Sequence, residues 1–334
     1  MNLQQRIDLL IRLGQYILNN DAEWLEAKER ASRQNNWFTS SFVEQASENI
    51  ATNYLNEEKL QSFTASYEVP GVSTSPVDVG LVMAGNIPLV GFHDLACIFL
   101  CGHQSMIKVS SKDEMLVKHL VEKMGEWNPE VYQAISFAAI LKGCHAYIAT
   151  GSNNSARYFE YYFSKYPHII RRNKTSVAIL TGSEPATALE ALADDVHLYF
   201  GLGCRSVTKI FVPTNYDFVP LLSAFKKFGY FGDHHKYKNN YDYQLAIHLI
   251  NHKYYMTNGS VLLSENPSFF SPISQLNYEY YTDRAFVENM VEMDVNIQCV
   301  MGIGHLPFGT SQSPALNDFA DGVDTMKFLL SLPR

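Results

Sequence analysis

Cys204 is the residue whose setting most clearly suits covalent chemistry. It follows Gly201 and Gly203, which allow a tight turn, and it precedes the apolar stretch 207–212. If Cys204 opens a short helical turn, unpaired backbone N–H groups and the neighbouring Arg205 would stabilise its thiolate. A free cysteine is also commonly a small buried apolar side chain. On local grounds both interpretations, a nucleophile and a core residue, stay open.

Other polar segments follow predicted strands and could bind a substrate or a nucleotide. Asn86 comes after the apolar stretch 80–84, where its amide could donate a hydrogen bond to a ligand or cap a turn. Lys108 ends a second apolar stretch, with Ser110 and Ser111 just behind it. This arrangement suits the ribose or phosphate of a nucleotide, and an exposed strand end explains it equally well.

Gly151 and Ser152 join a predicted strand at 145–149 to a helix that begins near Ser155. Backbone N–H groups at such a helix start can bind a phosphate, although the chain has no G-x-G-x-x-G fingerprint there. The spacing of His248 and His252 suits one helix face, but no adjacent Glu or Cys completes a ligand set, so no metal site is predicted. A serine hydrolase is disfavoured because the G-x-S-x-G turn is missing.

The elements that would position these residues alternate in type. Residues 1 to about 65 have apolar positions at helical spacing and almost no Gly or Pro, which predicts a helical lead-in. From residue 77 onward, short apolar or β-branched stretches alternate with helical patterns, which predicts a parallel, doubly wound α/β sheet. The expected strands are 77–83, 105–109, 145–149, 176–180, 208–213 and 260–264, and the expected helices include 113–127 and 155–166.

Size and composition exclude several classes of protein. The 334 residues suggest two domains, and a net charge of −8 disfavours nucleic-acid binding. Five scattered cysteines without a C-x-x-C pair fit a reducing compartment. The N-terminal pattern reads as an amphipathic helix rather than a signal peptide, and no apolar run is long enough to span a bilayer. We therefore expect a cytoplasmic protein.

Taken in order, these segments resemble landmarks of the aldehyde dehydrogenase superfamily. Within it, the chain most resembles the Lux-type fatty acyl-CoA reductases, over roughly residues 75 to 330. The segments that carry the resemblance are 85–94, 107–111, 149–159, 200–212 and 306–324.

The resemblance implies an α/β, aldehyde dehydrogenase-like fold with a parallel-sheet cofactor domain and an α/β catalytic domain. Expected boundaries are 1–175 for the helical lead-in and NADP-binding domain, 176–303 for the catalytic domain, and 304–334 for a tail returning to the cofactor domain. Cys204 would take the acyl group from coenzyme A, and Asn86 with the backbone N–H of Cys204 would form the oxyanion hole. Lys108, Ser110, Ser111, Gly151 and Ser152 would bind NADP(H).

Two departures from the superfamily pattern refine this expectation. In aldehyde-oxidising relatives, a glutamate activates the water that hydrolyses the acyl-enzyme. The corresponding position here is Ile170, which has no carboxylate, so we do not expect hydrolysis of an acyl-enzyme. The position of the acidic residue in NAD-preferring relatives is Ser111, followed by Lys112, so the 2′-phosphate of NADPH is tolerated.

The sequence therefore predicts an acyl-CoA reductase that releases an aldehyde, with a fatty acyl group as the expected substrate. Alternatives are an acyl-phosphate reductase of the glutamyl-phosphate type, and a non-redox cysteine acyltransferase or acyl-carrying subunit. The resemblance also implies a homo-oligomer and a possible acyl-synthetase or acyltransferase partner.

Overall fold

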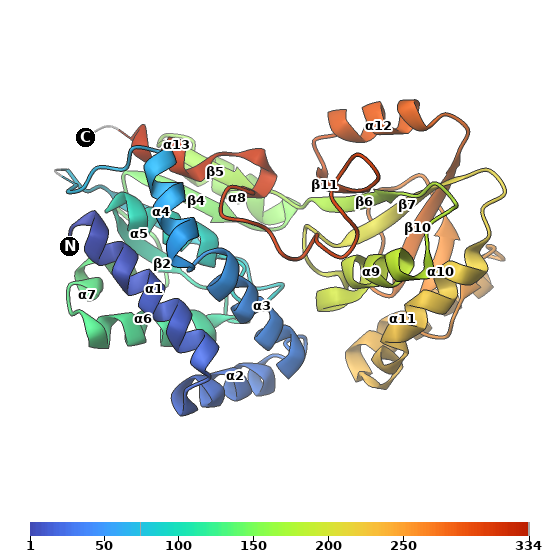
Figure 1. Cartoon of the computed structure of the whole chain (residues 1–334), viewed down its shortest axis with the longest axis horizontal. Helices are drawn as coiled ribbons and strands as arrows, with labels where there is room; N and C mark the ends of the chain where they lie inside the picture. Colours follow the sequence, from blue (N-terminus) through green and yellow to red (C-terminus); the bar gives the residue numbers. More distant parts are fainter. Residues whose placement is uncertain (74, 333–334) are drawn as a thin grey trace. The chain divides into compact units, whose positions relative to one another are not determined.

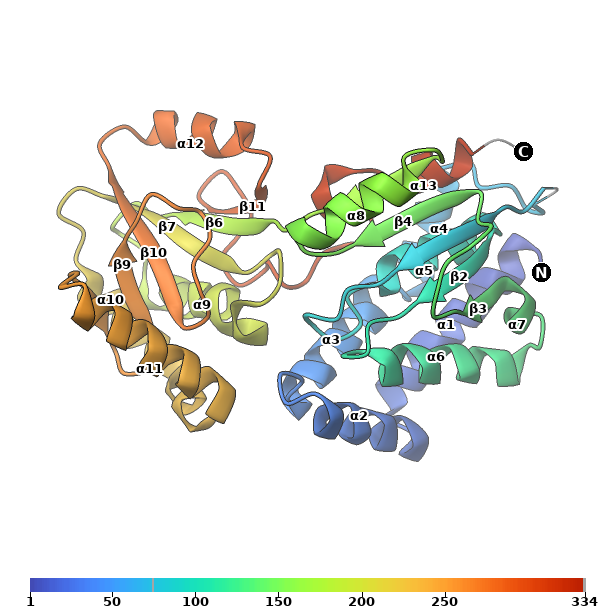
Figure 2. The same cartoon turned by 180° about the vertical axis from the view of Figure 1, so that it is seen from behind.

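The computed structural model describes residues 1–73 and 75–332, and it divides the chain into two compact units. The first unit combines Met1–Asn173 with the segment from Pro314 onward, and the second is Lys174–Ser313 (Figures 1 and 2). The second unit is therefore continuous in sequence, whereas the first is built from two separate segments.

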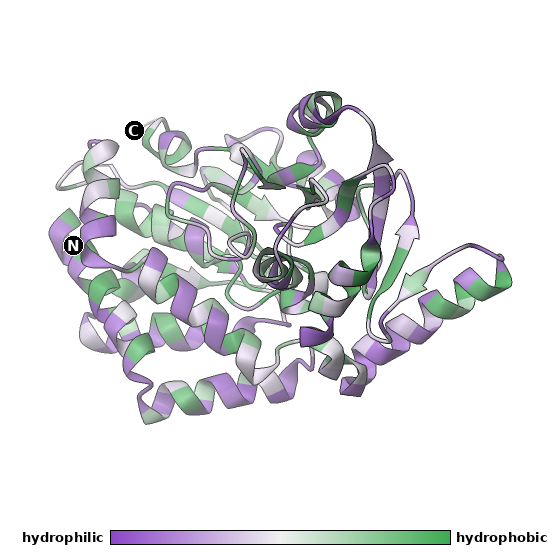
Figure 3. Cartoon of the chain, turned by 45° about the vertical axis from the view of Figure 1, so that its right-hand side comes forward, coloured by the Kyte–Doolittle hydropathy of each residue, from purple (hydrophilic) through white to green (hydrophobic). Residues whose placement is uncertain are grey.

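A series of amphipathic helices opens the first unit. It comprises α1 (Leu3–Asn19), α2 (Ala22–Gln34), α3 (Ser40–Asn53) and α4 (Glu57–Ser66). Helix α1 begins with a capping box, in which the side chains of Asn2 and Gln5 each accept a backbone N–H. It buries Ile7, Leu10 and Ile17, and Figure 3 shows hydrophobic and hydrophilic bands alternating along these N-terminal helices.

The sheet of the first unit is parallel throughout its described strands, in the order β3-β2-β1-β4-β5. Its elements are β1 (Asp78–Val82), α5 (Phe92–Cys101), β2 (Gln104–Lys108), α6 (Glu114–Trp127), α7 (Val131–Ala134), β3 (Ile135–Phe137), β4 (Ala146–Thr150), α8 (Asn153–Phe163) and β5 (His168–Arg171). The chain winds outward from β1 first through β2 and β3, then in the other direction through β4 and β5. The order thus reverses between β1 and β4, which is where open parallel sheets bind ligands.

The segment from Pro314 onward completes the first unit. Its helix α13 (Thr325–Leu330) packs on α5, and Met326 and Leu329 join the hydrophobic core. Because these side chains are fully buried among residues of the N-terminal segment, the two segments form one core.

A buried ion pair joins three elements of this unit. Arg171 at the end of β5 donates to Asp94 of α5, with 2.8 Å between Nη2 and Oδ1, and to the hydroxyl of Thr325 at 2.8 Å. Burial disfavours the charged carboxylate, but the charge and hydrogen bonds of Arg171 outweigh burial and keep the pKa of Asp94 below its ordinary value.

The second unit contains a mixed sheet of order β11-β6-β7-β10-β9-β8. Its elements are β6 (Thr175–Ile179), α9 (Ala186–His197), β7 (Val207–Pro213), α10 (Phe218–Ala224), α11 (His235–Ile250), β8 (Met256–Thr257), β9 (Leu262–Glu265), β10 (Gln275–Tyr281), α12 (Arg284–Met293) and β11 (Ile297–Gly302). Helices α9, α10 and α11 lie on one face and α12 on the other (Figure 1). Val287 and Val291 of α12 pack on the central strands, where they meet Val177, Ile179 and Phe211.

The structure confirms the predicted fold class and the helical lead-in. The predicted strands 77–83, 105–109, 145–149, 176–180, 208–213 and 260–264 correspond to β1, β2, β4, β6, β7 and β9. Helix α8 begins at Asn153, two residues earlier than expected, because Ser152 caps it by accepting the backbone N–H of Ser155. Within residues 1–73 and 75–332, no helix combines the length and apolar character needed to cross a membrane.

Candidate functional site

Cys204 lies in a turn that leads into the central strand β7, and its side chain is half-buried. The preceding 3-10 helix (Leu198–Gly201) contains Tyr199 and Phe200, both with φ of 55°. Together with Gly201 at φ 72°, these residues hold three successive left-handed conformations that reverse the chain. Cys204 follows this 3-10 helix and, with Arg205, forms the centre of a further turn in which the backbone N–H of Ser206 donates to the carbonyl of Gly203 at 3.1 Å.

The turn of Cys204 is held by a buried serine on each side. Ser176 of β6 donates its hydroxyl to the carbonyl of Cys204 at 3.1 Å, and its backbone N–H to the carbonyl of Ser206 at 3.1 Å. The Ser206 hydroxyl accepts the backbone N–H of Gly203 at 3.2 Å. The sulfur of Cys299 lies 2.9 Å from the Ser176 hydroxyl, which brings a second thiol beside this turn. The backbone around Cys204 is therefore fixed before any ligand arrives.

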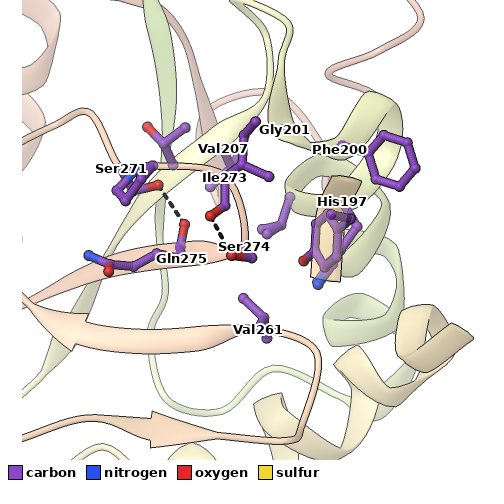
Figure 4. Close-up of a pocket in the computed structure, with 13 residues that line it drawn as sticks. His197, Phe200, Gly201, Val207, Val261, Ser271, Ile273, Ser274 and Gln275 are labelled. Atoms are coloured by element: carbon purple, nitrogen blue, oxygen red, sulfur yellow. Dashed lines mark hydrogen bonds between the residues drawn. The ribbon is translucent and has the colours of Figure 1, made fainter. Parts of the chain in front are cut away.

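A cavity adjoins this turn in the second unit. The flanks of the turn, Gly201 and Val207, both line it, together with residues of α9 and α11, Val261 just before β9, and the segment 271–275 that leads into β10 (Figure 4). Most of its lining is apolar, including Val196, Phe200, Val261 and Ile273. The cavity is small, with a volume of about 20 Å³, and Cys204 itself does not line it, so this cavity provides no open pocket for a substrate beside the thiol.

His197 lines the same cavity and is a neutral, buried residue. Its ring stacks on Phe228 at 4.8 Å between centroids and meets the ring of Phe225 edge-on. Burial lowers its pKa to about 4, and Nδ1 donates to the carbonyl of Ala193 at 2.8 Å. At neutral pH the His197 side chain is therefore uncharged and forms part of the apolar wall, and it does not act as a proton donor.

The polar residues predicted to bind a nucleotide meet at one edge of the first unit's sheet. Lys108 is the last residue of β2 and is exposed, and Ser110 and Ser111 follow it. Gly151 follows β4, and Ser152 caps helix α8. Because β1, β2 and β4 are adjacent and parallel, their carboxyl ends share an edge, at the reversal of strand order.

Asn86 stands at the same edge, in the loop between β1 and α5, and its side chain is exposed. The loop is tightly held: Leu89 has φ of 56°, and its backbone N–H donates to Asp113 at 2.7 Å. Burial raises the pKa of Asp113. At the other end of the loop, a Cβ on Gly85 would lie 2.5 Å from the Ser110 hydroxyl, so only glycine fits there. The loops after β1 and β2 are therefore packed against each other.

The structure thus brings Asn86, Lys108, Ser110, Ser111, Gly151 and Ser152 to one sheet edge of the first unit, while Cys204 belongs to the second. His252 lies beyond the end of α11, so it does not share a helix face with His248. In the described part of the chain, no group of three or more His, Cys, Asp or Glu side chains is arranged to hold a metal.

Sequence reasoning missed the residues that support these loops. Asp113, Ser176 and Gln312 make no recognisable motif, because each acts from a distant segment through a hydrogen bond. The nearest signal in the sequence was the resemblance of segment 306–324, which marked the region of Gln312 without giving it a role.

The architecture is that of solved aldehyde dehydrogenases. Aldehyde dehydrogenase 21 from Physcomitrella patens, in complex with the reaction product succinate, gives a TM-score of 0.69 at 11% identity, covering 99% of this chain and 84% of that one. Glyceraldehyde-3-phosphate dehydrogenase from Methanocaldococcus jannaschii, complexed with NADP, gives 0.63 at 12% identity, covering 90% and 76%. Betaine aldehyde dehydrogenase from Staphylococcus aureus gives 0.65 at 10% identity, covering 94% and 74%.

No model of a known protein family matches the chain, and neither does any curated protein. At these identities the structural likeness establishes an aldehyde dehydrogenase-like fold. The activity has to be argued from the residues of the two units.

Proposed function

We propose that the protein is an NADPH-dependent acyl-CoA reductase that works through an acyl-enzyme on Cys204. The observation that carries the proposal is the half-buried Cys204 thiol, held in a turn by Ser176, in a chain whose other unit has the reversal of strand order at which open parallel sheets bind ligands. The structural likeness to aldehyde dehydrogenases supports an oxidoreductase of this general type.

The first half-reaction would be acyl transfer. The Cys204 thiolate attacks the thioester carbonyl of acyl-CoA, a new carbon–sulfur bond forms, and the bond to coenzyme A breaks so that its thiolate leaves. The backbone N–H of Cys204 and the amide of Asn86 would stabilise the developing oxyanion.

The second half-reaction would be reduction. NADPH, held by residues at the sheet edge of the first unit, would supply the hydride that reduces the enzyme thioester. The thiohemiacetal anion on Cys204 would then collapse, releasing the aldehyde and restoring the Cys204 thiolate, and the proton would go to the coenzyme A thiolate released in the first half-reaction. The sum is acyl-CoA, NADPH and one proton giving aldehyde, coenzyme A and NADP. Ile170 supplies no carboxylate to activate water, which favours reduction over hydrolysis of the intermediate.

The residues at the sheet edge of the first unit fit the cofactor. A helix start leaves backbone N–H groups without intrahelical acceptors, so Ser152 and the start of α8 would hold the pyrophosphate, with Gly151, whose own N–H donates to the carbonyl of Arg171 at 3.2 Å, packed beside it. Lys108 and Ser110 would contact the adenosine ribose. Ser111 and Lys112 are exposed and neither is acidic, which favours the 2′-phosphate of NADPH over NADH.

The test is to follow NADPH oxidation with a panel of acyl-CoA thioesters from short to long chain. Wild type is compared with Cys204→Ala and with Cys144→Ala, a control that removes a buried thiol of the first unit. Acyl-dependent oxidation that disappears only in Cys204→Ala supports the proposal. Oxidation with acyl phosphate instead would identify the glutamyl-phosphate type, and acylation of Cys204 without oxidation would identify an acyltransferase or acyl-carrying subunit.

We also propose that the protein is cytoplasmic and forms a homo-oligomer. Sedimentation of the purified protein would test the oligomeric state. The described cysteines, all of them free thiols, are compatible with a reducing compartment. An acyl-synthetase or acyltransferase partner would supply the acyl group, and co-purification with acyl transfer to Cys204 would reveal it.

A further inference from the structure

The segment 306–313, here called the strap, returns from β11 to the turn that carries Cys204. Asp195 of α9 is fully buried and accepts two backbone N–H groups of the strap, from Gly309 at 2.6 Å and from Ser311 at 3.0 Å. Gly309 has φ of 85°, and a Cβ there would lie 3.1 Å from the Cβ of Ala191. The strap is therefore held closely against α9 by its backbone.

Gln312 extends from the anchored strap to the Cys204 turn. Its side chain is buried, and Nε2 donates to the Ser206 hydroxyl at 3.2 Å. The same hydroxyl oxygen accepts the backbone N–H of Gly203, the residue immediately before Cys204. Two acceptor positions of one fully buried hydroxyl are thus used to join the strap to the turn.

We propose that Gln312 is a positioning residue for Cys204, acting through the hydroxyl of Ser206. The inference rests on the proposed role of Cys204 as the nucleophile. A nucleophile must meet a carbonyl carbon while the backbone N–H beside it faces the oxyanion, so displacement of the turn disturbs both at once. Asp195 contributes by fixing the strap from which Gln312 reaches.

The first test is Gln312→Ala, measured as the single-turnover rate of Cys204 acylation by acyl-CoA in mass spectrometry. Because misplacement of a reacting group can cost on the order of 100-fold, we expect the rate to fall by roughly 10- to 100-fold. The KM for NADPH should not change, since the nucleotide-binding edge belongs to the first unit. The matched control is Gln61→Ala, an exposed glutamine of α4 whose side chain donates to Glu57 on the same helix.

A double-mutant cycle with Ser206→Ala tests the route of the effect. If Gln312 acts through Ser206, the double variant should acylate at about the rate of Ser206→Ala alone. Effects that multiply would mean that the two side chains act separately, and this would overturn the proposal.

The pH dependence of Cys204 alkylation by iodoacetamide separates positioning from a purely structural role. We expect the profile of Gln312→Ala to differ from that of wild type at an equal fraction of folded protein. If the pH profile of Gln312→Ala is the same as that of wild type and only the number of reactive molecules is smaller, the inference is overturned. This measurement needs no acyl-CoA. If acyl-CoA fails to acylate wild-type Cys204, the proposed function is wrong, but the alkylation profiles still test the role of Gln312.

Discussion

The hydroxyl of Ser176 donates a hydrogen bond to the carbonyl of Cys204, with 3.1 Å between Oγ and O. Ser176 is fully buried on β6, and its hydroxyl also contacts the sulfur of Cys299 at 2.9 Å. Strand β6 therefore supports the turn of the candidate nucleophile through hydrogen bonds that are separate from the one made by Gln312.

Ser176→Ala should slow acylation of Cys204 without changing NADPH binding. Loss of one hydrogen bond costs about 1 kcal/mol, which corresponds to a rate reduction of roughly 3- to 10-fold. Single-turnover acylation followed by mass spectrometry measures it, with the exposed Ser183→Ala as the matched control. A wild-type rate in Ser176→Ala would show that the turn keeps its geometry without this contact.

Gly85→Ala should weaken NADPH binding, because the added Cβ would lie 2.5 Å from the hydroxyl of Ser110. Forcing an extra methyl group into a packed site costs about 1 to 3 kcal/mol, so affinity should fall by roughly 5- to 150-fold. Fluorescence titration with NADPH gives both affinities, and equal affinity in Gly85→Ala and wild type would contradict the assignment of this edge.

Arg171→Ala should strongly destabilise the first unit, because it leaves the buried carboxylate of Asp94 without its cation. Removal of one partner of a buried pair typically costs about 3 to 5 kcal/mol. Urea unfolding measures the loss, and the double variant Arg171→Met with Asp94→Leu should recover much of it. If the single variant unfolds at the wild-type urea concentration, the pair contributes little.

The same pair predicts a loss of stability in acid. The pKa of Asp94 is lower in the folded protein than its ordinary 3.8, so the stabilisation is complete above that value and disappears as pH falls through the lower, native pKa. Thermal unfolding between about pH 5 and pH 2 should show this loss in wild type and a smaller one in the double variant.

His197 predicts a separate pH dependence at milder acidity. Its pKa is lowered from 6.5 to about 4 by burial, so below pH 6.5 the unfolded chain binds a proton that the folded chain does not bind until about pH 4. Stability should therefore fall between these values, by about 3 kcal/mol in total. His197→Phe, which suits the surrounding aromatic rings, should flatten this part of the curve of unfolding free energy against pH. An unaltered slope would show that folding does not lower the pKa of His197.

Strands and helices with a strong pattern were predictable from the sequence. The strands that correspond to β1, β2 and β4 stand out because continuous apolar stretches alternate with helical periodicity, and this pattern also gives the α/β class. The polar residues at the strand ends, Asn86 and Lys108, follow from the same reasoning, since parallel strands bring their carboxyl ends to one edge.

The supporting contacts were not predictable in this way. Asp195 and Gly309 are far apart in sequence, and their contact depends on the path of the strap across α9. The left-handed conformations of Tyr199 and Phe200 were missed because aromatic residues rarely adopt them, so the sequence carries no signal for the reversal before Cys204.

The discontinuous first unit has a consequence for the order in which the protein is assembled during synthesis. The second unit is complete once Ser313 has left the ribosome, whereas the core of the first unit still lacks Met326 and Leu329 of α13. The surface of α5 that α13 covers therefore stays uncovered until the segment after Ser313 has been made. A purified chain truncated after Ser313 should consequently contain every residue of the second unit but lack part of the core of the first.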